Sequence, residues 1–171
     1  MKNENPMKEV QLEKITLNIG TGGPGDKLEK AMKLLSKISE GKPVITKTKK
    51  RIPTWGLRPG LEIGCMITLR GKKAEELLKR LFVGIDNKVP ATKFDKSGNF
   101  SFGIGEYLHI PKVEYDSTIG IIGLEVAVTL KRKGFRVKRR LIRPARIAKT
   151  HQITKAEAID YVKSKYGVDV A

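Results

Sequence analysis

The sequence predicts an α+β fold: a mostly antiparallel sheet with helices packed on one face, an open second face, and a basic C-terminal arm followed by a short terminal helix. Four segments alternate apolar and polar residues, which is typical of strands that bury one face. Two segments between them repeat apolar residues with the helical period. The second phase of the strands is polar or poor in side chains, so we expect that face of the sheet to stay uncovered. With 171 residues, 39% of them hydrophobic, the chain can bury a core without disulfides or metals.

The first half of the chain predicts three strands, at residues 10–19, 43–47 and 61–69. A helix follows the first strand. We expect Asp26 to cap it, Glu29 to complete a capping box and Gly41 to end it. Residues 48–60 contain two prolines and two glycines without a sustained period, which predicts a long mobile loop.

The second half predicts a helix with its apolar face at Ala74, Leu77, Leu78 and Leu81, a loop at residues 84–98, and strands at residues 100–104 and 120–131. Thr154 and Glu157 predict a capping box for a terminal helix, which Gly167 should end. Because residues 136–150 are basic and irregular, we divide the chain into a domain of residues 1–135 and a basic arm with its helix, residues 136–171.

Positive charge is concentrated in two segments. The formal net charge is +17, yet residues 42–58 hold six basic and no acidic residues, and residues 131–171 hold thirteen basic and three acidic ones. Solvated faces are one explanation, but both segments interleave the charges with apolar residues, which favours a polyanionic partner. Gly134 and Pro144 argue against a long basic helix on a membrane surface. The N-terminus has no apolar signal core and no apolar run approaches ~20 residues, so a cytoplasmic protein without a membrane span is expected.

A glycine-rich turn, Gly20–Gly25, fits the pattern G-x-G-x-x-G between a strand and a helix, and so raises a dinucleotide-binding enzyme as an alternative. The preceding strand alternates, whereas a buried parallel strand would be continuously apolar. Asp26 would repel a pyrophosphate, and the next strand ends in Thr46 and Lys47 rather than an acidic residue. A structural turn is therefore the favoured interpretation.

Catalytic and metal-binding patterns are weak. Cys65, His109 and His151 are spread along the chain, and Cys65 falls on the apolar phase of its strand, as a core residue would. No Ser lies in a nucleophile elbow. We expect no catalytic residue, no metal site and no cofactor.

Two basic segments favour RNA binding. In the loop, Lys49, Lys50, Arg51 and Arg58 surround Trp55, which either stacks on a base or ribose or packs back on the domain. In the arm, the expected RNA-binding cations are Arg136, Lys138, Arg139, Arg140, Arg143, Arg146 and Lys149. Interleaved apolar residues distinguish this arm from a solubility tail.

Four stretches carry a family resemblance: EKITLNIGTG (13–22), KPVITKTKKRIPTWGLRPGLEIGCMITLRG (42–71), GNFSFGIGE (98–106) and YDSTIGIIGL (115–124). They resemble the strands and central block of the large-subunit ribosomal protein family L-five, the carriers of 5S rRNA. The resemblance covers about residues 7–131. The chain is similar to archaeal members because it lacks the N-terminal helical extension of bacterial ones and adds a basic C-terminal arm.

This resemblance implies a structural constituent of the large ribosomal subunit, which binds 5S rRNA in the central protuberance and catalyses no reaction. The 5S rRNA would contact six residues on the polar phase of the strands: Thr16, Asn18, Thr46, Lys47, Thr68 and Arg70. The loop at residues 49–60 would reach peptidyl-site tRNA, and residues 85–97 would face the small-subunit head across an intersubunit bridge. Large-subunit rRNA and a neighbouring 5S-binding protein of the L-eighteen family would be further partners. The arm lies outside the resemblance, so its contact with rRNA rests on charge. A free regulatory or chaperone-like RNA binder is the alternative.

Overall fold

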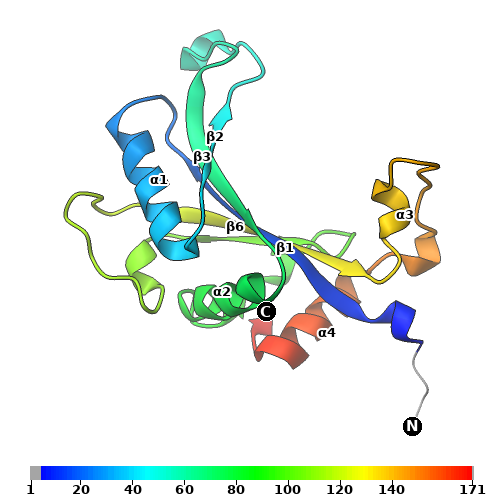
Figure 1. Cartoon of the computed structure of the whole chain (residues 1–171). Coiled ribbons are helices and arrows are strands. Elements are labelled where there is room, and N and C mark those ends of the chain that lie inside the picture. Colours follow the sequence, from blue (N-terminus) through cyan, green and yellow to red (C-terminus); the bar gives the residue numbers. More distant parts are fainter. Residues whose placement is uncertain (1–4, 171) are drawn as a thin grey trace.

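A computed structural model describes residues 5–170 and contains a five-stranded antiparallel sheet (Figure 1). Its strands, in spatial order, are β2 (Val44–Lys47), β3 (Glu62–Leu69), β1 (Val10–Gly20), β6 (Leu124–Arg132) and β5 (Phe100–Ile104). Every pair of neighbours in this sheet is antiparallel. The predicted α+β class and sheet are therefore confirmed.

Helices cover one face of this sheet. Helix α1 (Asp26–Ser39) packs against β3, and helix α2 (Lys72–Val83) packs against β1. The strands bury the apolar phase that the alternation predicted, such as Ile15 and Leu17 of β1 and Val126 of β6, because only that phase can leave water without a polar penalty. The Phe82 ring of α2 stacks on the strand residue Phe102 at 5.5 Å between centroids.

The ends of α1 differ from the prediction. Asp26 is the first helical residue and not the cap; Gly25 occupies the cap with a φ of 123° that other residues rarely adopt. No side chain of the described residues caps this end, so the predicted capping box with Glu29 is wrong. At the other end, Glu40 rather than Gly41 takes the left-handed conformation, with a φ of 51°.

The predicted loop at residues 84–98 contains a short strand. Strand β4 (Lys88–Val89) pairs in parallel with β7 (Asp169–Val170), next to the C-terminus. A two-residue strand has no measurable period, so sequence alone could not reveal it. The predicted strand at residues 120–131 in fact begins at Leu124.

The terminal helix α4 (Lys155–Tyr166) begins at the predicted capping box of Thr154 and Glu157 and ends at Gly167, which takes a left-handed φ of 65°. Ala158 and Val162 are buried in the main core, so this helix is packed on the domain. The arm, residues 136–150, is mostly irregular, as predicted, apart from one turn of helix, α3 (Arg136–Arg139), and the start of a 3-10 turn at Lys149–His151. Within residues 5–170 no helix is long and apolar enough to cross a membrane.

Candidate nucleic-acid interface

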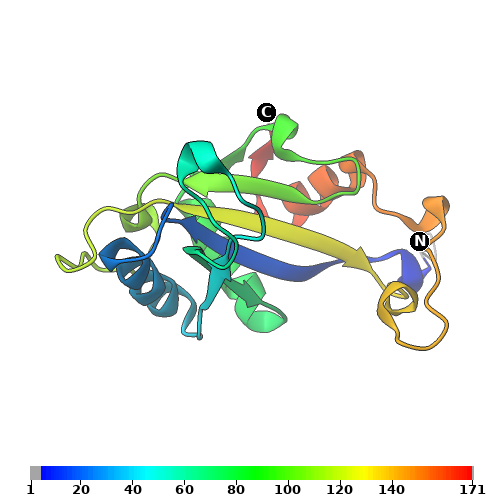
Figure 2. The same cartoon turned by 90° about the horizontal axis from the view of Figure 1, so that it is seen from above.

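The second face of the sheet is free of helices over the described chain, and we call it the open face. Figure 2 views it from above, where β5, β6 and β1 run side by side. Strand register places Thr16 beside Thr68, and their hydroxyl oxygens lie 3.3 Å apart. Asn18, which is exposed, is flanked by Met66 and Glu125. The register thus brings Thr16, Asn18 and Thr68 together, as their shared phase indicated.

The pairing of β2 with β3 contains an irregularity, because one extra β3 residue, Ile63, lies between the partners of Thr46 and Lys47. Thr46 pairs with Gly64 and Lys47 pairs with Glu62, so the register shifts between them. The Lys47 ammonium forms an ion pair with the Glu62 carboxylate at 3.3 Å. That acid was on the predicted polar phase, but its pairing with Lys47 was not foreseen, and it offsets part of the lysine's charge. Arg70 directly follows β3 and is exposed.

Near Asn18, glycines leave part of the open face without side chains. A shallow depression of about 320 Å³ lies there, lined partly by Gly20, Gly103 and Gly123, with Asn18 and Glu125 at its sides. A Cβ atom added to Gly123 would lie 2.7 Å from the Gly105 carbonyl oxygen, so a side chain is excluded at that position. Sequence reasoning noticed the missing side chains of the β5 segment but not the carboxylate of Glu125 beside them.

The basic loop between β2 and β3 is an extension of that hairpin. Backbone hydrogen bonds join Thr48 to Leu61 and Gly60 to Thr48, both at 2.8 Å, and Ile52 pairs with Leu57 at the tip. A 3-10 turn at Pro53–Trp55 presents Trp55 with 72% of its surface exposed. The alternative in which this ring packs back on the domain is therefore wrong. The loop cations Lys49, Lys50, Arg51 and Arg58 are all exposed.

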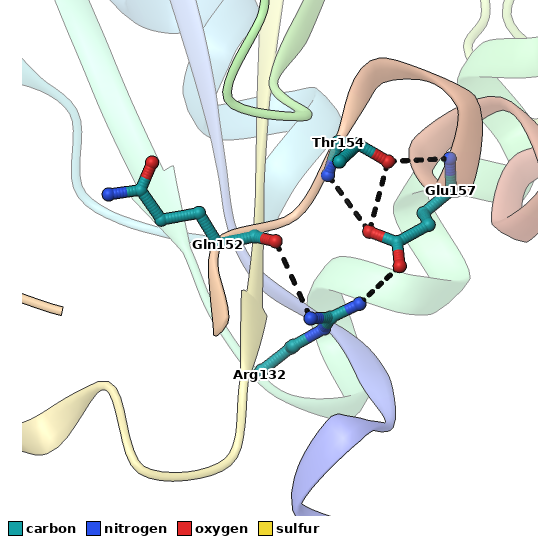
Figure 3. A network of polar contacts seen from close by, with 4 residues as sticks. All are labelled: Arg132, Gln152, Thr154 and Glu157. Carbon is teal, nitrogen blue, oxygen red and sulfur yellow. Dashed lines mark hydrogen bonds and ion pairs between the residues drawn. The ribbon is translucent and has the colours of Figure 1, made fainter. Parts of the chain in front are cut away.

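The two ends of the arm are joined by polar contacts, so it is a closed loop rather than a free tail; Figure 3 shows the contacts of Arg132 at its base. At its base, the Arg132 guanidinium donates to the Gln152 carbonyl oxygen at 3.4 Å and to the Glu157 carboxylate at 2.5 Å. His151 Nε2 lies 2.9 Å from the Lys133 carbonyl oxygen, which joins the two ends of the arm. All seven predicted arm cations are exposed: Arg136, Lys138, Arg139, Arg140, Arg143, Arg146 and Lys149.

The basic loop and the arm stand at opposite ends of the open face and rise on its side of the sheet (Figure 1). The polar open face of the sheet therefore lies between two positively charged segments, the basic loop and the arm. That arrangement suits a polyanion laid across the sheet, since these segments attract phosphates while the open face offers hydrogen bonds.

The structure gives little support to a dinucleotide site, a reactive cysteine or a metal site in the described residues. Both neighbours of β1 are antiparallel, so the turn Gly20–Gly25 lacks the adjacent parallel strands of a dinucleotide-binding unit. Burial raises the pKa of the Cys65 thiol to about 11, which keeps it protonated at neutral pH. Residues 5–170 contain no group of three or more His, Cys, Asp or Glu side chains placed to hold a metal ion.

Two parts of one family match the chain. The family described as Ribosomal protein L5 matches residues 5–58, and the C-terminal part of the same ribosomal family matches residues 62–161. The second match includes the whole arm, so the similarity extends further than the resemblance in residues 7–131.

Curated relatives agree over nearly the full length. The chain is 46% identical over 168 residues to the large ribosomal subunit protein uL5 of Nanoarchaeum equitans, covering 98% of this chain and 99% of that protein. It is 46% identical to uL5 of Sulfurisphaera tokodaii, covering 97% of this chain and 94% of that protein. For uL5 of Methanosphaera stadtmanae the identity is 40%, with coverages of 97% and 99%.

Proposed function

Because the chain belongs to the ribosomal protein L5 family, we propose that it is a structural component of the large ribosomal subunit and works in the ribosome in the cytoplasm. Its specific partner is 5S rRNA in the central protuberance, and the open face of the sheet is the binding surface. The observation that carries this proposal is the cluster of Thr16, Asn18 and Thr68 on an uncovered sheet between two basic ends.

The open face offers the RNA two kinds of contact, hydrogen bonds and charge. Thr16, Asn18, Thr46 and Thr68 offer hydroxyl and amide groups, which can donate to and accept from ribose and base edges and so set the position of the RNA. Lys47 and Arg70 contribute charge toward phosphates. With ~6 phosphate contacts in all, log K should fall with log salt at a slope of roughly −4 to −5.

The loop and the short strand β4 supply the outward contacts. We propose that residues 49–60 reach the peptidyl-site tRNA, with the exposed Trp55 ring stacking on a base or ribose. Residues 85–97 would face the small-subunit head, held in place by the pairing of β4 with β7. The arm would bind large-subunit rRNA, next to a 5S-binding protein of the L-eighteen family. None of these roles requires catalysis; the protein acts by positioning RNA.

The test compares affinities for 5S rRNA, a transfer RNA and a random RNA of the same length at several salt concentrations. We expect at least a hundredfold preference for 5S rRNA, which N18A/T68A should abolish while leaving the salt slope unchanged. The control S36A/S164A removes two exposed hydroxyls from helices α1 and α4 and should keep the preference. Equal binding of all three RNAs by the unmodified protein would refute the proposal and favour a charge-driven RNA binder.

A further inference from the structure

A basic cavity lies where the arm meets the sheet. It has a volume of about 430 Å³ and lies between β1, the end of β6 and helix α3. Six of its nine lining residues are cations: Lys131, Arg132, Lys133, Arg136, Arg139 and Arg140. None of the lining residues is acidic. Its size lies in the range of ordinary small-molecule sites, roughly 300–1,000 Å³, and its charge selects an anion.

Three of these cations are held in place by acids outside the cavity. Lys133 pairs with Glu9 at 2.8 Å and Arg139 with Glu13 at 2.8 Å. Lys133 also holds the pKa of the Glu9 carboxyl below its ordinary value, mainly by hydrogen bonding, so this pair stays charged at neutral pH. Arg132 is likewise paired, with Glu157. These pairs fix part of the cavity wall.

The other three cations, Lys131, Arg136 and Arg140, have no acidic partner among residues 5–170. Arg140 instead donates from Nε to the Arg143 carbonyl oxygen at 2.7 Å, which leaves its terminal nitrogens available. Three like charges gathered in one cavity repel one another, and a bound anion would relieve that repulsion. A phosphate group fits this need, since guanidinium groups bind it with paired hydrogen bonds.

The remaining lining side chains match the other parts of a nucleotide. Phe135 is half-buried and contacts the His151 ring edge-on at 5.8 Å between centroids, which leaves its ring in a fixed position in the wall. Gln11 donates its amide to Glu9 at 3.3 Å, and its amide oxygen has no donor among the described residues. An aromatic ring beside cations is how proteins commonly hold an unstacked base and its phosphate.

We propose that this cavity binds one nucleotide of the ribosomal RNA, with its phosphate on Lys131, Arg136 and Arg140 and its base against Phe135. This inference rests on the proposed function, because it takes the arm's partner to be RNA. It adds a definite subsite to what is otherwise a charged surface. An acidic peptide would satisfy the cations but would make no use of the aromatic wall.

The test is a backbone-amide NMR titration of the full chain with adenosine monophosphate, inorganic phosphate and uncharged adenosine. We expect the mononucleotide to shift the signals of Gln11, Gly134 and Phe135 at millimolar concentration, at least threefold more tightly than inorganic phosphate. Adenosine should bind at least tenfold more weakly. Equal affinity for inorganic phosphate and the mononucleotide would overturn the nucleotide assignment. Shifts spread evenly over the arm and the basic loop would overturn the cavity as a site.

Two variants make the test specific. K131A/R136A should abolish the cavity signals and weaken binding of large-subunit rRNA at least tenfold. The control K27A/K30A removes the same charge from exposed positions on α1 and should change neither result. F135L should keep phosphate binding and lose the preference for the mononucleotide; an unchanged preference would contradict a base on Phe135.

These outcomes separate the cavity from the open face. If the mononucleotide binds the cavity while N18A/T68A leaves 5S rRNA affinity unchanged, the open-face proposal fails and the cavity stands. If N18A/T68A abolishes the preference for 5S rRNA while the cavity ignores the mononucleotide, the inference fails and the proposed function stands.

Discussion

Removing the carboxylate of Glu157 should destabilise the protein because it leaves a buried guanidinium without its anion. Only 6% of the Arg132 side chain is exposed. Beyond the 2.5 Å bond to Glu157, the structure gives it one long bond of 3.4 Å to the Gln152 carbonyl oxygen. The Arg132 Nε atom is buried and has no acceptor in the described part of the chain. The arginine therefore has little to replace the carboxylate.

The magnitude follows from the burial of each partner. Breaking a fully buried pair costs about 3–5 kcal/mol. The Glu157 side chain is 43% exposed, so water can reach the vacated site, and we expect E157Q to cost about 2 kcal/mol. Gln can still accept at the third position of a capping box, whereas Ala cannot. E157A should therefore lose about 1 kcal/mol more, or about 3 kcal/mol in all.

Urea unfolding followed by far-ultraviolet circular dichroism at pH 7 measures these differences as shifts of the midpoint at constant slope. R132M should cost about 1 kcal/mol or less, because it removes the buried charge and leaves Glu157 free to hydrate. R132M/E157Q should be no worse than R132M by more than about 0.5 kcal/mol, since the two residues act as one unit. The control E76A, at an exposed position on α2, should stay within about 0.5 kcal/mol of the unmodified protein. Costs below about 0.5 kcal/mol for both E157Q and E157A would refute a stabilising role of the ion pair between Arg132 and Glu157.

Further predictions concern probes that the structure places in distinct environments. Trp55 is the single tryptophan and is exposed, so its emission should resemble that of indole in water and change on adding tRNA; weak quenching by acrylamide in the free protein would contradict this. Cys65, buried and with a pKa of about 11, should react with a thiol reagent at pH 8 orders of magnitude more slowly in the folded chain than in urea. The pKa of Glu157 is lowered from 4.5, chiefly by the Thr154 backbone N–H, so its stabilisation is present above pH 4.5 and lost as the pH falls through the folded value. The free energy of unfolding of E157Q should therefore lack the part of the acid-induced decrease that comes from protonation of Glu157. Limited trypsin digestion of the free protein should cut first in residues 48–60 and in the arm; first cuts within α1 or α2 would exclude both as the mobile parts.

Most of the sheet could be predicted because alternation reports burial directly. Ile15, Leu17 and Val126 sit where a one-sided core requires them, and the polar partners Thr16 and Thr68 are opposite each other as a consequence. The first helix's cap could not be predicted in the same way. Asp26 has the right chemistry, but the backbone conformation of Gly25 displaces the cap by one residue.

Contacts between segments that are far apart in the sequence could not be predicted from local patterns. The pairing of β4 with β7 joins residues about 80 positions apart through two residues each. The shift between the pairs Thr46–Gly64 and Lys47–Glu62 is an irregularity that a strict period of two does not predict. Glu13, which pairs with the arm cation Arg139, likewise lies on a strand far away in sequence. Charge counts along the chain indicated the sign of each surface but not which charges are already compensated.

Because the arm is closed, it should lose less conformational entropy on binding than a free basic tail would. A free basic tail would lose the conformational freedom of each residue when it bound RNA. Here the contacts of Arg132 and of His151 with the far end of the arm restrict the chain before any partner arrives. Folding thus fixes the two ends of the arm and leaves its tip mobile, so under the proposed function the pair of Arg132 with Glu157 should affect RNA affinity as well as stability. The apolar tip residues Leu141 and Ile142, 96% and 77% exposed, gain nothing from this closure. A partner that covered them would remove this apolar surface from water, which agrees with the proposed binding role of the arm.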